Sequence, residues 1–218
     1  MLRILTRWIM FTTILGGLVL ALSNGWRDGW MWAYACAVSV CALNAILSVT
    51  PNLARERFRP PSSGEDAIAL VFIRLLGFGH LVVGALDAGR WHLLPAVPAP
   101  LRAAALAMMT AAFLFIFRAM RENQFFSAVV RIQSDRGHRV IDSGPYSVVR
   151  HPGYAGMAVG IPASGLALGS WIGFAIALGY AGLILRRAAF EDRFLQRELA
   201  GYADYTRRVQ SRVIPGLW

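Results

Sequence analysis

The sequence has no lysine, only two cysteines, and few charged residues, which make up 16% of its 218 positions. With 56% hydrophobic residues, this composition excludes an ordinary soluble domain and indicates an integral membrane protein. Cys36 and Cys41 lie in one apolar run, and their spacing suits neither a zinc site nor a disulfide. The four histidines also lack the spacing of metal ligands: His80, His92, His138 and His151. We therefore expect no structural metal.

Because lysine is absent, all 22 basic residues are arginine, a bias that we attribute to genome composition. They outnumber the 12 acidic residues and give a formal net charge of +10. Such an excess can indicate a nucleic-acid partner, but in a membrane protein it more often reflects the cytoplasmic loops. We expect membrane lipids and no nucleic acid as partners.

Six apolar segments can be drawn along the chain, at residues 4–22, 30–49, 67–86, 101–120, 153–168 and 171–185. A membrane-spanning helix needs about 20 apolar residues, so the last two segments are short. Only Gly169 and Ser170 separate these two, which predicts a tight helical hairpin. The predicted fold class is all-α, a polytopic membrane helical bundle with five to six transmembrane helices.

The arginines predict the orientation of this bundle. If the N-terminus is cytoplasmic, the arginines on that side are Arg3, Arg7, Arg55, Arg57, Arg59, those of residues 118–150 and all seven from Arg186 onward. The opposite side receives Arg27 and Arg90. By the positive-inside rule, both termini are cytoplasmic. We expect the membrane to be a bacterial inner membrane.

The most informative motif covers residues 144–156, where an arginine-rich segment meets an apolar one. Arg150 offers a guanidinium for a carboxylate or phosphate, and His151 offers an imidazole. Tyr154 and Gly156 follow within about two turns of a helix. Charge at the edge of hydrocarbon is costly, so the motif predicts a site for a polar or anionic partner. The alternative is a cytoplasmic arginine anchor in front of an ordinary helix.

A second pattern follows the last apolar segment. Gly201 and Pro215 are expected to limit the helix there. Residues recur at three- and four-residue steps, which predicts a stripe on one helix face: Glu191, Leu195, Glu198, Leu199, Tyr202 and Tyr205. The carboxylates of Glu191 and Asp192 could hold a cation or the hydroxyls of a ribose. They could equally form a solvated acidic turn that balances nearby arginines.

Four further residues are substrate candidates. Asn123 and Phe126 belong to a polar segment that is either a substrate rim or an interfacial helix with its aromatic rings in lipid. Arg74 and His80 lie inside the third apolar segment, where ionisable groups usually face protein or water. They could line a substrate cavity or form pairs inside the bundle.

Taken together and in this order, the patterns resemble the isoprenylcysteine carboxyl methyltransferase-like family of integral membrane methyltransferases, to which the phospholipid methyltransferases are related. The resemblance is carried by residues 144–146, 150–156, 191–195, 202–205, 208–209 and 214–215. It is dense over residues 121–218 and rests mainly on the helix pattern over the first hundred residues.

This resemblance implies a methyltransferase that uses S-adenosyl-L-methionine in a cofactor pocket at the cytoplasmic face. The cofactor contacts that it implies are His151, Tyr154, Gly156, Glu191, Asp192, Leu195 and Tyr205. It also implies a catalytic pair, Arg150 with an acidic residue, for which we take Glu191. The family often has two glutamates where this chain has Glu191 and Asp192. We expect a single domain over 1–218, with scaffold helices in 1–100 and the catalytic core in 121–218.

The predicted function is methyl transfer to a lipid-like or isoprenoid-type acceptor, through a carboxylate, hydroxyl or amine. Alignment of the reacting groups would supply much of the rate, about 7–11 kcal/mol. One alternative is an NADPH-dependent membrane enzyme of the sterol-reductase type, although residues 199–205 lack the cysteine and tryptophan of that family's C-terminal motif. The other is a non-catalytic module that binds anionic lipid. The sequence does not indicate the oligomeric state.

Overall fold

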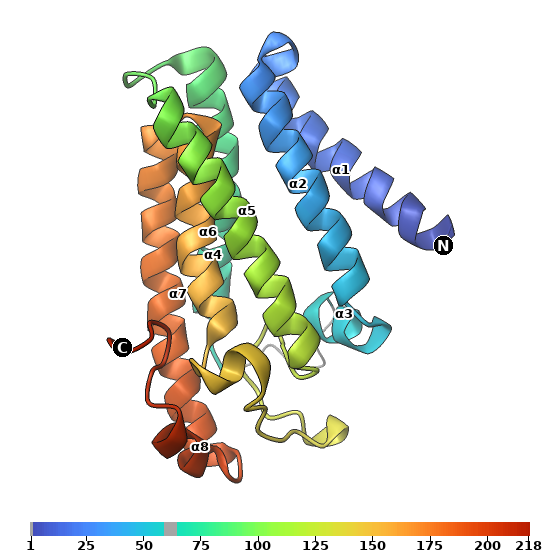
Figure 1. The fold of residues 1–218 in the computed structure, drawn as a ribbon, viewed down its shortest axis with the longest axis vertical. Helices are drawn as coiled ribbons and strands as arrows, with labels where there is room; N and C mark the ends of the chain where they lie inside the picture. Colours follow the sequence, from blue (N-terminus) through green and yellow to red (C-terminus); the bar gives the residue numbers. More distant parts are fainter. Residues whose placement is uncertain (1, 59–64) are drawn as a thin grey trace.

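The structure, a computed structural model, describes residues 2–58 and 65–218, which form helices and connecting segments without a strand (Figure 1). In chain order the α-helices are α1 (Leu2–Leu22), α2 (Gly29–Ser48), α3 (Pro51–Phe58), α4 (Ala67–Leu86), α5 (Ala99–Glu122), α6 (Pro152–Leu168), α7 (Trp171–Glu198) and α8 (Tyr202–Arg208). Short helical turns add η1 (Gly25–Arg27), η2 (Asp87–Trp91), η3 (Ser134–Arg136) and η4 (Gly144–Ser147). The predicted all-α fold class is confirmed.

Among the described residues, five helices are long and apolar enough to cross a membrane: α1, α2, α4 with η2, α5 and α7. Helix α6 has 17 residues, which span about 26 Å and fall short of a hydrocarbon core of about 30 Å. Five spanning helices agree with the predicted five to six. The protein is thus a membrane protein in which α6 is the short member.

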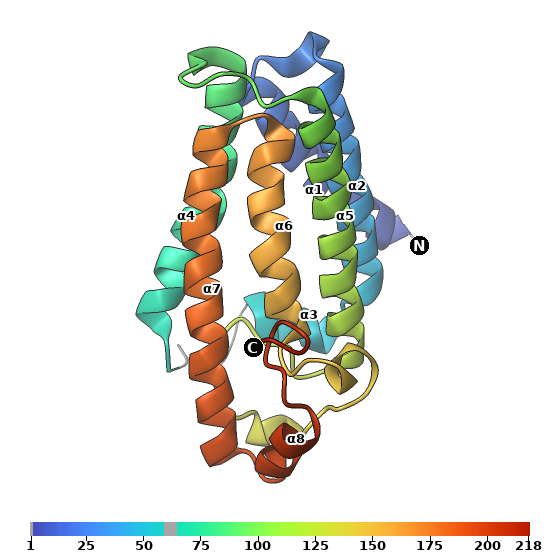
Figure 2. The same cartoon turned by 60° about the vertical axis from the view of Figure 1, so that its left-hand side comes forward.

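The predicted hairpin joins α6 to α7. Gly169 ends α6 with a backbone φ of 96°, a left-handed conformation that glycine adopts without steric cost. Ser170 then caps α7, because its side-chain oxygen accepts a hydrogen bond from the backbone N–H of Gly173 at 2.9 Å. The two helices consequently run antiparallel, side by side (Figure 2).

Helix α6 packs tightly between α5 and α7 because small residues let the backbones approach. A Cβ added to Gly165 would lie 2.5 Å from the backbone nitrogen of Phe174 on α7. A Cβ added to Gly156 would lie 2.5 Å from Cγ1 of Ile116 on α5. Gly156 therefore serves the contact between α5 and α6, and it does not line the cavity described below.

A buried polar group crosses the bundle at Ser164 of α6. Its hydroxyl lies 2.7 Å from the hydroxyl of Tyr34 on α2 and 3.1 Å from Nε2 of His80 on α4. Hydrogen bonds of this kind hold membrane helices together. Of the two alternatives left open for His80, the structure shows pairing inside the bundle, and the residue does not line the cavity described below.

At the end of the bundle that carries the α6–α7 turn, arginines satisfy helix C-termini. Arg90 donates from Nε to the carbonyl of Leu22 at 2.7 Å, and Arg102 donates from Nη2 to the carbonyl of Leu168 at 2.9 Å. A guanidinium there binds the carbonyls that lack a helical partner and complements the helix dipole. Arg102 lies at this end too, in addition to Arg27 and Arg90, which the charge pattern assigned to this side.

The opposite end, which we call the polar end, holds α3, residues 123–151, the last turns of α7, and α8 with the residues that follow it (Figures 1 and 2). Most arginines of the described chain lie there, as the charge pattern predicted. Of the residues used for that prediction, Arg59 and the side chains of Arg3, Arg55 and Arg57 lie outside the described part.

The predicted stripe over 191–205 does not lie on one helix, because the helix is interrupted at Gly201, a residue that was expected to limit it. Helix α7 ends at Glu198, and α8 begins after Gly201, whose backbone φ is 80°. The chain turns at this glycine, so Tyr202 and Tyr205 reach the site from a separate element. The three- and four-residue spacing was correct for each helix but not across the turn.

Candidate active site

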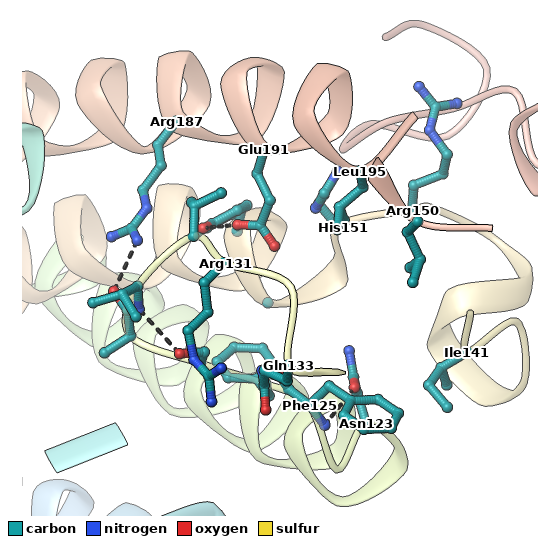
Figure 3. A pocket seen from close by; sticks show the side chains of 18 of the residues that line it. Asn123, Phe125, Arg131, Gln133, Ile141, Arg150, His151, Arg187, Glu191 and Leu195 are labelled. Carbon is teal, nitrogen blue, oxygen red and sulfur yellow. Dashed lines mark hydrogen bonds between the residues drawn. The ribbon is translucent and has the colours of Figure 1, made fainter. Parts of the chain in front are cut away.

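A cavity of about 600 Å³ lies at the polar end, a volume within the range of ligand sites. Its wall comes from α4, residues 123–141, the start of α6, the C-terminal half of α7, and α8 (Figure 3). The predicted site residues that line it are Arg74, Asn123, Phe126, Arg150, His151, Tyr154, Glu191, Leu195 and Tyr205. Sequence positions more than a hundred residues apart thus meet in one chamber.

Glu191 is the only acidic residue among the described residues that line this cavity. It sits on α7 and accepts a hydrogen bond at Oε2 from the hydroxyl of Tyr154 on α6 (Figure 3). Leu195 lies one turn further along α7 and continues the same wall. Since the other charged lining residues are arginines, Glu191 is the group best placed to bind a cation or hydroxyl of a ligand.

Arg150 uses its guanidinium within the protein. It binds both carboxylate oxygens of Asp192, from Nε at 2.7 Å and from Nη2 at 2.9 Å. Its Nη1 donates to the carbonyls of Val209 and Gln210 at 2.8 and 2.7 Å. Figure 3 shows the guanidinium turned away from Glu191, toward the C-terminal residues. Arg150 therefore reaches the cavity with the rest of its side chain or its backbone, and its charge is directed elsewhere.

Asp192 lies behind the cavity wall, with no exposed surface. Five side chains bind its carboxylate: Arg150, His151, Gln196, Tyr202 and Arg212. A buried carboxylate with so many donors is stabilised in its ionised form. The resemblance implied that Asp192 contacts the cofactor, but the structure places it one layer further out.

His151 connects this buried carboxylate with the cavity. Its Nε2 lies 3.2 Å from Asp192 Oδ1 and 3.3 Å from the hydroxyl of Tyr202, and its ring lies 5.6 Å from that of Tyr154. The imidazole lines the cavity immediately before α6 begins at Pro152. Asp192 and Tyr202 thus fix the position of a ring that forms part of the wall.

The residues after α8 complete this arrangement. The backbone N–H groups of Arg150 and His151 donate to the carbonyls of Ser211 and Arg212 at 3.0 and 2.9 Å. Arg212 also donates from Nε to Asp192 at 3.1 Å. These contacts hold residues 209–213 against the start of α6. They also hold the motif at residues 150–152 in place.

Tyr205 and Asn123 are joined through Tyr146. The hydroxyl of Tyr205 donates to the backbone carbonyl of Tyr146 at 2.6 Å, and Nδ2 of Asn123 donates to the Tyr146 hydroxyl at 3.2 Å. All three residues line the cavity. Phe126 lies against Gly153, where a Cβ would come within 2.4 Å of the phenyl ring. Gly153 therefore lets the aromatic wall approach α6.

Arg74 lines the cavity from α4, at its membrane side, and its side chain is exposed. It is the one candidate from the third apolar segment that reaches the cavity, since His80 does not. No pattern in the sequence pointed to Arg187 of α7 as a site residue. It also lines the cavity and donates from Nη2 to the carbonyl of Ala128 at 2.8 Å (Figure 3).

His138 in the cavity wall is held as a neutral imidazole. Its Nδ1 accepts a hydrogen bond from the backbone N–H of Gln133 at 3.3 Å, and its ring stacks on Phe125 at 4.6 Å. Burial, reinforced by the charges of Arg131 and Arg136, lowers the pKa of His138 to about 4. The charged ring could not accept this hydrogen bond, because both of its nitrogens would carry protons.

We expect acidification to destabilise this wall. Between pH 6.5 and pH 4 the unfolded chain binds a proton at His138 that the folded protein does not, so stability falls as the pH falls through this window. Thermal unfolding in detergent from pH 7 to pH 4 would measure it. A His138→Gln variant serves as the control, and it should lose less stability over this range. A constant difference between the two proteins would contradict the prediction.

Within residues 2–58 and 65–218, no group of three or more His, Cys, Asp or Glu side chains is placed to hold a metal ion. The chamber instead offers one carboxylate, several tyrosine hydroxyls, two imidazoles and apolar residues of α4 and α7. These groups can orient a polar ligand and exclude water from it.

Residues 101–200 match the family model for phospholipid methyltransferase. This span covers α5, α6 and α7, and it contains His151, Tyr154 and Glu191. The match confirms the predicted resemblance to the isoprenylcysteine carboxyl methyltransferase-like membrane methyltransferases, to which the phospholipid methyltransferases are related, over residues 101–200. A direct comparison with curated proteins finds no match.

Proposed function

We propose that this membrane protein transfers a methyl group from S-adenosyl-L-methionine to a lipid-like acceptor at the cytoplasmic face. The observation that carries the proposal is the meeting of His151, Tyr154 and Glu191 at one cavity inside the segment that matches the methyltransferase family model. The concentration of arginines at the polar end supports a cytoplasmic position for that cavity. Residues 121–218 form the catalytic core in this proposal, and 1–100 the scaffold.

The cavity suits the proposed methyl donor in size and chemistry. S-adenosyl-L-methionine carries ribose hydroxyls, an ammonium group, a carboxylate and an adenine ring. Glu191 provides an acceptor for the hydroxyls or the ammonium, while His151, Tyr205 and Leu195 provide polar and apolar wall. The arginines that line the chamber complement the carboxylate. When bound, S-adenosyl-L-methionine would supply a methyl group on a sulfonium. The acceptor attacks this methyl carbon opposite the sulfur, which leaves as a neutral thioether.

The chain's own residues would then align the reactants rather than react with them. The hydroxyl of Tyr154 holds the Glu191 carboxylate in place, and Asp192 holds the ring of His151. With an amine or hydroxyl acceptor, Glu191 accepts the proton that the acceptor loses; a carboxylate acceptor loses none. Arg150 acts as a positioning residue, because its guanidinium ties Asp192 to residues 209–210.

The acceptor enters from the membrane in this proposal. The inner part of the cavity is lined by apolar side chains of α4, α6 and α7, among them Ile73, Met157 and Ile184. Such a wall suits the hydrocarbon part of an acceptor, while Arg74, Asn123 and Phe126 contact its polar part. Isoprenoid-type and phospholipid acceptors both have this amphipathic form.

Calorimetric titration of the purified protein with S-adenosylhomocysteine, run beside NADPH, tests the proposal. We expect saturable binding of the sulfur nucleotide and none of NADPH. Binding of NADPH alone would favour a membrane reductase. Binding of neither, together with no transfer of labelled methyl groups to extracted lipids, would favour a lipid-binding module.

A further inference from the structure

Residues 127–131 form one wall of the cavity, and all five of them line it. They follow α5 within the family-matched segment, where Arg187 of α7 binds the carbonyl of Ala128. Further contacts come from the N-terminal half of the chain. Three residues outside the matched segment contact them or their partners: Glu56, Glu65 and Asp66.

Glu56 makes the densest of these contacts. Its Oε1 accepts hydrogen bonds from the Ser127 hydroxyl at 2.8 Å and from Nε of Arg131 at 3.0 Å, and its Oε2 accepts one from Nη2 of Arg131 at 2.8 Å. The guanidinium of Arg131 and the carboxylate of Glu56 thus form a bidentate ion pair, which fixes their relative orientation. The Glu56 side chain is 4% exposed and Arg131 is 13% exposed.

Helix α3 presents Glu56 from a fixed position. Leu53, three residues earlier and so on the same face, is 2% exposed and packs on Ile116 and Met120 of α5. Burial alone would raise the pKa of Glu56, but the hydrogen bonds from Arg131 and Ser127 lower it below its ordinary value. The carboxylate is consequently charged at neutral pH, and it holds both partners.

Two more contacts hold the middle of the same wall. The backbone N–H of Glu65 donates to the carbonyl of Val130 at 3.0 Å. Arg187 of α7 donates to the carbonyl of Ala128 and forms an ion pair with Asp66, with Nε 2.9 Å from Oδ2. Glu65 and Asp66, which immediately precede α4, thus fasten residues 127–131, Glu65 directly and Asp66 through Arg187.

We propose that Glu56 is a positioning residue for the cavity: through Ser127 and Arg131 it holds residues 127–131 in the shape that binds the methyl donor. The inference rests on the proposed function for the identity of the ligand, but not for the ordering of the wall. It assigns the N-terminal helices a part in binding, although they lie outside the matched segment. Glu56 itself does not line the cavity.

The same arginine provides a matched control. Nη1 of Arg131 binds Asp135 at 2.9 Å, on the solvent side, where Asp135 is 56% exposed. An exposed ion pair contributes little, whereas a buried charge that loses its partner is left uncompensated. Replacing Asp135 by asparagine therefore removes one carboxylate from Arg131 without uncovering the wall.

The experiment compares Glu56→Gln, Glu56→Asp and Asp135→Asn with the unmodified protein in detergent. Hydrogen exchange reports the order of the wall, and calorimetry reports the Kd for S-adenosylhomocysteine. For Glu56→Gln we expect about tenfold faster exchange confined to residues 125–133 and about tenfold weaker binding. Glu56→Asp should fall between, since it keeps the charge on a shorter stem. Asp135→Asn should resemble the unmodified protein in both measurements.

Unchanged exchange at residues 125–133 in Glu56→Gln would overturn the inference. Faster exchange spread evenly over all helices would overturn it too, because Glu56 would then support only the global fold. If Glu56→Gln does not fold, Glu56→Asp carries the same comparison. Localised exchange in a protein that binds no S-adenosylhomocysteine would uphold the positioning role and reject the proposed function.

Discussion

Replacing Arg150 by alanine is expected to lower the free energy of unfolding by about 3–5 kcal/mol. The reason is that Asp192 is fully buried and would lose the bidentate partner that neutralises it. The carbonyls of Val209 and Gln210 would lose their donor as well. Denaturant or thermal unfolding in detergent would measure the loss. This result would differ from what the resemblance implies, which is a catalytic role for Arg150.

Two controls separate this effect from the general loss of a charge. Arg208 pairs with Asp142 at the surface, with the two side chains 65% and 45% exposed, so Arg208→Ala should change stability by less than about 1 kcal/mol. In an Asp192→Asn background, Arg150→Ala should destabilise much less, since no buried charge remains unpaired. An equal loss in both backgrounds would show that the ion pair is not the cause.

Replacing Glu191 by glutamine should reduce methyl transfer by about 100-fold or more. Glutamine keeps the size of the side chain and can still accept the hydrogen bond from Tyr154, so the fold should be retained. It lacks the charge that would bind the donor's cationic or hydroxyl groups and receive a proton. Transfer of a labelled methyl group to lipid would give kcat/KM, and calorimetry the affinity for S-adenosylhomocysteine.

Glu198 supplies the matched control for this variant. It lies on the same helix, seven residues further on, but it is exposed and does not line the cavity. Glu198→Gln should leave kcat/KM within about twofold of the unmodified value. If Glu191→Gln transferred methyl groups as fast as Glu198→Gln, Glu191 would have no part in the reaction.

The helices could largely be predicted from the sequence, because hydropathy alone decides which segments prefer a membrane. The α6–α7 hairpin was equally visible, since Gly169 and Ser170 leave room only for a tight turn. Gly201 was also expected to limit the helix, but the separate helix α8 beyond it was not expected. Periodicity continues through Gly201, and only the left-handed backbone at that residue redirects the chain.

The sequence predicted the candidate site only in part, because a linear motif does not show which of its residues face the cavity. Motif residues such as His151, Tyr154 and Glu191 do meet at one cavity. Their neighbours in sequence, however, serve packing and pairing: Gly156 accommodates Ile116, and Asp192 binds Arg150. Within a helix, residues one or two positions apart face different directions, and a linear motif does not record which of them faces the ligand.

The contacts from the N-terminal half left little trace in the sequence. Glu56 stands among arginines in α3, and its partner Arg131 lies 75 residues away. Hydropathy shows only that both residues belong to polar segments. Pairing across such a distance depends on how α3 packs against α5, which is a property of the folded bundle.

The contacts of residues 209–213 have a consequence for the order of biosynthesis. Every membrane helix of the described chain precedes these residues, and Arg150 and His151 acquire their backbone partners only when Ser211 and Arg212 have left the ribosome. The bundle can therefore insert and assemble while the pocket is still incomplete. The contacts that hold the start of α6 from behind therefore form only after the membrane helices of the described chain have been made.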